Sequence, residues 1–197
     1  MDKLQNKLLE TCHIYGHFVN ASKTHTDQRI EFENLKRRIL LKRKTVKALG
    51  LIIGSEFPEA DRIVTVARGA NWMAEPVAKM ASTLLGRQVE FSKTIKIGEN
   101  REFNLVGGNI YVRDENCVIL DDVYNFGTNT SKVAQRIYQF QGVPIGIVTV
   151  FNRNPNGGTE LIMPNFNTIP VRSYVNIPIN SWSPEECDPS VCTTELS

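Results

Sequence analysis

The sequence has no long hydrophobic run, few cysteines and almost no net charge, and each shortage excludes a class of protein. No stretch reaches the roughly 18 consecutive apolar residues of a membrane-spanning helix, and the N-terminal MDKLQNKLLE has no apolar signal core. Lys and Arg number 23 against 21 Asp and Glu, so the net charge of +2 is too small for a general polyanion binder. We therefore expect a cytoplasmic protein with neither a membrane nor a nucleic-acid partner.

The chain has only four cysteines, Cys12, Cys117, Cys187 and Cys192. A chain of 197 residues can bury a sufficient core without a disulfide or a metal to hold it together. The two C-terminal thiols cannot complete a tetrahedral zinc site alone, since the other ligands would have to come from Cys12 and His13 at the far end of the chain. Reduced thiols are therefore favoured over zinc. The three histidines are expected to be structural or exposed rather than catalytic: His13, His17 and His25.

The middle of the chain alternates between short apolar runs and helical patterns. The predicted strands are 63–67, 89–91, 117–120 and 145–151, and the predicted helices between them are 75–85 and 131–140. Buried strands with helices between them are typical of an α/β fold with a mainly parallel central sheet flanked by helices.

The flanking segments have weaker patterns. Residues 1–14 and 33–49 are predicted helices, the second ending at Gly50, and 17–32 forms small strands or an ordered loop. Residues 92–102 are polar and predicted to be flexible. The proline-rich last 35 residues predict a tail of loops and strands. Seven Lys or Arg residues lie in 36–47; a solvated helix face is favoured over an anion-steering patch.

The most informative segment is CVILDDVYNFGTNTSKVAQRI, residues 117–137. A buried strand delivers Asp121 and Asp122 to its C-terminal end, where parallel sheets bind ligands. A loop containing Gly127, Thr128 and Thr130 then leads into a helix, whose first backbone N–H groups favour an anion. Two carboxylates followed by an anion-binding loop and helix start suit a ribose 5-phosphate, whose hydroxyls and phosphate they would bind. The alternative is structural: the acidic pair caps a turn, and the Thr and Asn residues cap the helix.

This segment resembles the phosphoribosyl pyrophosphate signature of the type I phosphoribosyltransferases, and the chain is most like the orotate phosphoribosyltransferases over roughly residues 14–192. Four further segments resemble that family in the same order along the chain. They are FVNASKTHTD (18–27, base-binding loop), IVTVARGANWMA (63–74, pyrophosphate loop), FSKTIKIGE (91–99, mobile catalytic loop) and VFNRNPNGG (150–158, orotate-reading loop). The resemblance implies one domain over 1–197, with a core sheet over 55–155 and a small hood formed by 1–50 and 160–197.

The resemblance also implies roles for particular residues. Lys93 and Lys96 would be catalytic, and Ser22, Lys23 and Arg153 would contact the base. The residues implied to bind phosphoribosyl pyrophosphate are Arg68, Gly69, Asp121, Asp122, Asn125, Phe126, Gly127, Thr128, Asn129 and Thr130. The implied reaction transfers ribose 5-phosphate to a nucleobase, orotate being favoured, with Mg²⁺ as cofactor and no protein ligand assigned to the metal. A homodimer is implied as well.

Three alternatives stay open at this point. The chain departs from the family pattern at Ser92, Gly98, Asn125 and Phe126. These departures allow a phosphoribosyltransferase for another base, or a protein that senses phosphoribosyl pyrophosphate without catalysis. An α/β domain with an unrelated phosphate ligand is the third alternative.

Overall fold

The structure, a computed structural model, describes residues 1–20, 23–97, 102–106, 112–164 and 167–187. Its α-helices are α1 (Lys3–Cys12), α2 (Glu33–Lys36), α3 (Ile39–Glu56), α4 (Ala74–Leu85) and α5 (Thr128–Gln139), with two 3₁₀ turns, η1 (Gly69–Trp72) and η2 (Pro184–Glu186). Its strands are β1 (His13–Val19), β2 (His25–Ile30), β3 (Arg62–Thr65), β4 (Glu90–Ile97), β5 (Glu102–Val106), β6 (Asn116–Tyr124), β7 (Val143–Asn152), β8 (Glu160–Ile162) and β9 (Thr168–Asn176). Within these residues, no helix is both long and apolar enough to cross a membrane.

A seven-stranded sheet in the order β5-β4-β3-β6-β7-β9-β8 forms the centre of the molecule. The inner pairs β3–β4, β3–β6, β6–β7 and β7–β9 are parallel, and the two outermost strands, β5 and β8, pair antiparallel to their neighbours. This arrangement confirms the predicted mainly parallel α/β fold.

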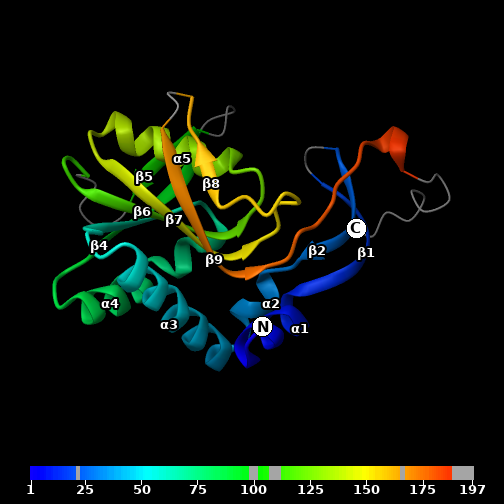
Figure 1. Cartoon of the computed structure of the whole chain (residues 1–197), viewed down its shortest axis with the longest axis horizontal. Coiled ribbons are helices and arrows are strands. Elements are labelled where there is room, and N and C mark those ends of the chain that lie inside the picture. Colours follow the sequence, from blue (N-terminus) through cyan, green and yellow to red (C-terminus); the bar gives the residue numbers. More distant parts are fainter. Residues whose placement is uncertain (21–22, 98–101, 107–111, 165–166, 188–197) are drawn as a thin grey trace.

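Helices cover both faces of this sheet (Figure 1). Along β6, Val118 and Leu120 pack with residues of α3 and α4, whereas Ile119 points to the opposite face and packs with residues of α5. Side chains two residues apart share a face of a strand, so a strand buried on both sides reads as the continuous apolar run seen in the sequence.

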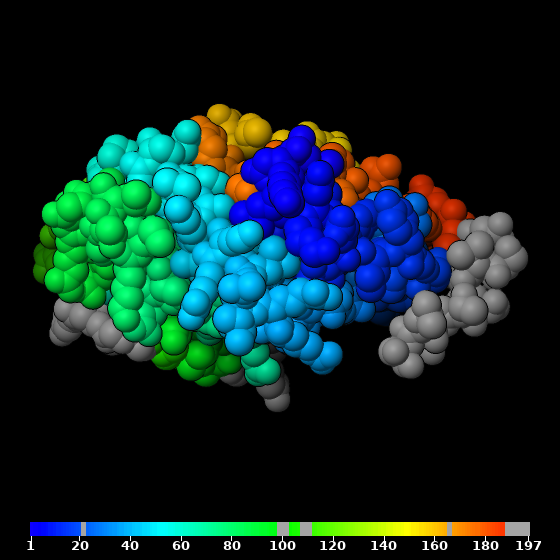
Figure 2. Space-filling model, turned by 90° about the horizontal axis from the view of Figure 1, so that it is seen from below, coloured from blue at the N-terminus to red at the C-terminus, as the bar shows by residue number. Residues whose placement is uncertain are grey.

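A second, two-stranded sheet stands beside the core. Strands β1 and β2 pair antiparallel, and the chain after β9 returns to this hairpin, where His25 and Trp182 form an isolated bridge (Figure 1). We call β1, β2 and residues 177–187 the hood. In Figure 2, α1 in dark blue lies between α3 and the blue strands of the hood.

The core includes segments outside the predicted range 55–155. Residues 160–176 contain β8 and β9, which extend the core sheet, and α3 packs on that sheet through Leu49 and Ile53. Both regions carry apolar side chains that the sheet buries, so they belong to the core rather than to the hood.

Two local predictions are also corrected. The helix predicted to end at Gly50 continues to Glu56, because Gly50 serves close packing rather than a cap: a Cβ there would lie 2.3 Å from Met80 Cγ of α4. The segment 92–102, predicted to be flexible, continues β4 as far as Ile97, and β5 begins at Glu102. The sequence did not predict this part of β4 because its buried positions are polar. Ser92 and Thr94 are fully buried, and both form hydrogen bonds.

Candidate active site

Two adjacent carboxylates lie near the C-terminal end of β6, the strand at the middle of the sheet. Asp121 is buried, and its Oδ1 accepts a hydrogen bond from the backbone N–H of Asp122 at 2.9 Å. Its Oδ2 accepts one from the hydroxyl of Thr130 on α5, at 3.2 Å. Burial, and then the neighbouring charge of Asp122, raise the pKa of Asp121 well above its ordinary value.

The turn after β3 comes into close contact with the second carboxylate. A Cβ at Gly69 would lie 1.7 Å from Asp122 Oδ2, so only glycine fits there without displacing that side chain. Asn71 holds the same turn in place: the Thr65 hydroxyl donates to its Oδ1 at 2.6 Å, and its Nδ2 donates to the Thr94 carbonyl of β4 at 2.9 Å. Gly69 of the predicted pyrophosphate loop, 63–74, therefore lies against Asp122 of the predicted ribose-binding pair.

A glycine begins the third part of the site. Gly127 precedes α5 with φ 75°, and a Cβ there would lie 2.9 Å from the Tyr124 hydroxyl, so both its conformation and its surroundings favour glycine. The first N–H groups of α5 follow, in the position that favours an anion. The Thr130 hydroxyl has only one proton and gives it to Asp121, so Thr128 is the predicted hydroxyl donor that stays available to a phosphate.

Asp121 and the start of α5 line a single cavity of about 350 Å³, whereas Asp122 and the turn at Gly69 are not among its lining residues. Its lining residues are Thr24, Asp121, Val123, Asn125, Phe126, Gly127, Thr128, Asn129, Thr130, Arg153 and Ser181. The side chain of Asn125 has its Oδ1 buried without a hydrogen-bond partner among the described residues. Buried polar atoms nearly always form a hydrogen bond, so an atom without one in a cavity wall indicates a place where a polar ligand could donate to it.

Arg153 brings positive charge to this cavity from the end of β7. Its backbone N–H donates to the Tyr124 carbonyl at 2.8 Å, which fixes the turn beside the end of β6. Burial lowers the pKa of its guanidinium, and the charge of Arg29 on β2 lowers it further. Arg29 pairs with Glu31 at 3.4 Å, so Arg153 is the cation of the two that lines the cavity. Arg29 has no signal in the sequence, because its position depends on how the hood packs beside the core.

Six of the predicted residues that the structure describes lie outside the cavity lining: Lys23, Arg68, Gly69, Lys93, Lys96 and Asp122. Lys93 and Lys96 are three residues apart on β4 and therefore point to opposite faces, with their Nζ atoms 5.8 Å from the Phe91 ring and 5.1 Å from the Phe103 ring. Lys23 is exposed with φ 64°. Ser22 lies outside the described residues.

No protein-family model matches the sequence, and no curated protein is similar to it at a significant level. Several solved structures have a fold similar to that of this chain. Orotate phosphoribosyltransferase from Aeropyrum pernix superposes with a TM-score of 0.63 and 17% identity, over 88% of this chain and 93% of that one. The Francisella tularensis orotate phosphoribosyltransferase gives 0.60 and 13%, over 88% and 84%.

A second activity occurs among the similar structures. Adenine phosphoribosyl transferase from Trypanosoma brucei, solved with AMP, pyrophosphate and ribose-5-phosphate, gives a TM-score of 0.63 and 12% identity, over 96% of this chain and 86% of that one. The similarity thus extends over nearly the whole chain but does not distinguish between bases. The chain has the type I phosphoribosyltransferase fold that its sequence resemblance predicts.

Proposed function

We propose that this protein is a phosphoribosyltransferase that transfers ribose 5-phosphate from phosphoribosyl pyrophosphate to a nucleobase, with orotate as the favoured base. The observation that carries the proposal is the cavity itself, in which Asp121, the glycine-led start of α5 and Arg153 line one space. These groups suit, in order, ribose hydroxyls, a 5-phosphate and a carboxylated base.

In this reaction a ring nitrogen of the base forms a bond to C1 of the ribose while the C1–oxygen bond to pyrophosphate breaks. The electron pair leaves with the pyrophosphate, which takes up the proton lost by the base. Asp121 and Asp122 would orient the ribose through its hydroxyls, and Arg68 with Gly69 would contact the leaving group. Catalysis here is mainly positioning and electrostatic stabilisation.

The carboxylate oxygens of the site are suitable ligands for Mg²⁺. This ion keeps several waters and commonly takes one or two carboxylates together with substrate phosphates, and Asp121 and Asp122 supply two carboxylates beside the cavity. Bound there, Mg²⁺ would offset negative charge on the leaving group. Asp121 already accepts two hydrogen bonds, so Asp122 is the carboxylate more available to the ion or to the ribose.

The roles of Lys93 and Lys96 remain part of the proposal. The β4–β5 hairpin would have to move for both ammonium groups to approach pyrophosphate, because they lie on opposite faces of the strand. Loss of Lys93 in the variant Lys93→Ala should then reduce turnover while leaving the binding of phosphoribosyl pyrophosphate measurable.

A cytoplasmic homodimer completes the proposal. Exposed apolar side chains at the start of α3 support an interface, since Ile39 is 68% and Leu40 73% exposed. Light scattering on the purified protein tests this, and a monomer at high concentration would contradict it.

The test of the activity is pyrophosphate release from phosphoribosyl pyrophosphate and Mg²⁺, with orotate, uracil or adenine as acceptor. We expect turnover with orotate, and none when Asp122 is replaced in Asp122→Asn. Turnover only with uracil or adenine would contradict the choice of base. Tight binding measured by calorimetry without product from any base would indicate a sensor instead of an enzyme.

A further inference from the structure

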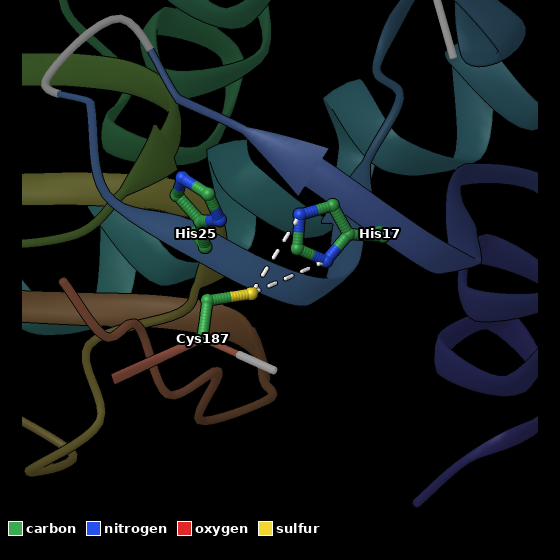
Figure 3. Close-up of side chains that lie close together, drawn as sticks. All are labelled: His17, His25 and Cys187. Carbon is green, nitrogen blue, oxygen red and sulfur yellow. Dashed lines mark hydrogen bonds between the residues drawn. The ribbon is translucent and has the colours of Figure 1, made fainter. Parts of the chain in front are cut away.

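Three side chains with metal-binding atoms meet in the hood, away from the cavity lining. They are His17 of β1, His25 of β2 and Cys187, which follows η2 (Figure 3). One ligand atom from each, two ring nitrogens and a sulfur, all lie within 4.8 Å of one another. In Figure 3 the Cys187 side chain points toward the ring of His17, with His25 beside them.

The backbone brings these residues together from distant parts of the sequence. His17 and Cys187 are 170 positions apart. The segment after β9, which we call the tail, is held to β2 by two hydrogen bonds. His25 N–H donates to the Trp182 carbonyl at 2.9 Å, and Trp182 N–H donates to the His25 carbonyl at 3.1 Å. A capping box formed by Ser183 and Glu186 then fixes η2, and Cys187 directly follows that turn.

The spacing of the three groups is close to that of a tetrahedral site. Zn–S and Zn–N bonds of about 2.3 and 2.0–2.1 Å at a tetrahedral angle place sulfur and nitrogen roughly 3.6 Å apart. The Cys187 Sγ lies 3.9 Å from each ring nitrogen of His17. Zinc binding requires one of these nitrogens to approach the sulfur by a few tenths of an ångström and the ring to rotate so that the lone pair of that nitrogen points at the metal. The rings of His17 and His25 have centroids 5.0 Å apart and lie edge to face, which leaves their nitrogens able to converge.

The environment of the cluster also favours a metal. His25 is 6% and Cys187 8% exposed. Thiolate and imidazole together are the ligands that zinc prefers, whereas Mg²⁺ and Ca²⁺ prefer oxygen. Three protein ligands leave a fourth coordination position for water or a further group.

We propose that His17, His25 and Cys187 form a zinc site that fastens the tail to the β1–β2 hairpin. The site goes beyond the proposed activity and does not depend on it. It adjoins the cavity through the chain, because Thr24 precedes His25 and Ser181 precedes Trp182, and both Thr24 and Ser181 line the cavity. A bound metal would therefore hold the segments that carry Thr24 and Ser181 in place rather than take part in chemistry in the cavity.

Elemental analysis of the untagged protein, purified from cells grown with zinc, is the first experiment. We expect one zinc per chain, and loss of that zinc in His17→Gln and in Cys187→Ser. His13→Gln is the matched control, since His13 lies on the same strand but bonds to Gln28 outside the cluster, and it should keep its zinc. Circular dichroism checks that each variant is folded.

Cobalt substitution is the second measurement and needs no variant. Co²⁺ bound to the wild-type protein should show a thiolate-to-metal charge-transfer band and the intense visible bands of tetrahedral cobalt. Zinc-free wild-type protein that also fails to bind added Zn²⁺ would overturn the proposal. So would a cobalt spectrum without the thiolate band, unchanged zinc content in both folded variants, or copper in place of zinc.

Discussion

Gly69→Ala tests the contact between the turn after β3 and the acidic pair. The new Cβ would lie 1.7 Å from Asp122 Oδ2, and ordinary van der Waals contact begins at 3.4 Å, so the carboxylate must move by about 1.7 Å. Hydrogen bonds tolerate only about half an ångström of such change. A bond to a charged group contributes about 1.5–3 kcal/mol, so we expect roughly 10- to 150-fold weaker binding of phosphoribosyl pyrophosphate.

The fold should tolerate this substitution. The atom that clashes most is at the end of a side chain, and the one described hydrogen bond at risk is that from Val123 N–H to Asp122 Oδ1, at 3.0 Å. We therefore expect the free energy of unfolding to fall by no more than about 1.5 kcal/mol.

Isothermal titration calorimetry with Mg²⁺ present measures the affinity, and urea unfolding measures the stability. Gly54→Ala is the matched control: it makes the same chemical change on α3, where the nearest atom, Leu84 Cβ, is 3.3 Å from the new Cβ. Folded Gly69→Ala protein that binds as tightly as the wild type would refute the role of Asp122. A wild type that does not bind phosphoribosyl pyrophosphate at all would refute the proposed function itself.

Three other substitutions test separate parts of the structure. Because the pKa of Asp121 is raised on folding, its contribution to stability is present below about pH 4 and is lost as the pH rises toward the folded-state pKa. The melting temperature of Asp121→Asn relative to wild type should therefore increase between pH 4 and 8, and a constant difference in thermal melts would contradict this. Arg153→Gln should raise KM for orotate about 100-fold in steady-state assays without weakening phosphoribosyl pyrophosphate binding; equal effects on both ligands would contradict a role in reading the base. Gly50→Ala should destabilise the fold by about 1–3 kcal/mol in urea because of Met80, while Gly54→Ala should not, and equal midpoints would contradict the packing argument.

The sequence predicted the parts of the site that are continuous along the chain. The run from Val118 to Thr130 contains a buried strand, an acidic pair, a glycine and a helix start, and each has a local signal in its residue type. The α/β class followed from the same local patterns. The acidic pair lies near the C-terminal end of a parallel strand, as predicted, because the buried apolar run ends directly before it.

The parts that the sequence did not predict depend on contacts between distant segments. Arg29 interacts with Arg153 only because the hood packs beside the core. The buried Thr94 hydroxyl accepts from Ala67 N–H and donates to the Thr65 carbonyl at the start of this turn, and buried polar residues give no hydrophobic period. Gly50 was ambiguous, since a glycine in a helical pattern indicates either an end or a close packing contact.

The return of the tail to β2 has a consequence for the order of folding. The core sheet can form from neighbouring segments, whereas the His25–Trp182 bridge joins positions near opposite ends of the described chain. Contacts so far apart in sequence form slowly, because the loop between them must first be closed. We expect a transient species during refolding that has an intact sheet and an open pocket, able to hold a phosphate at α5 before it can enclose a base.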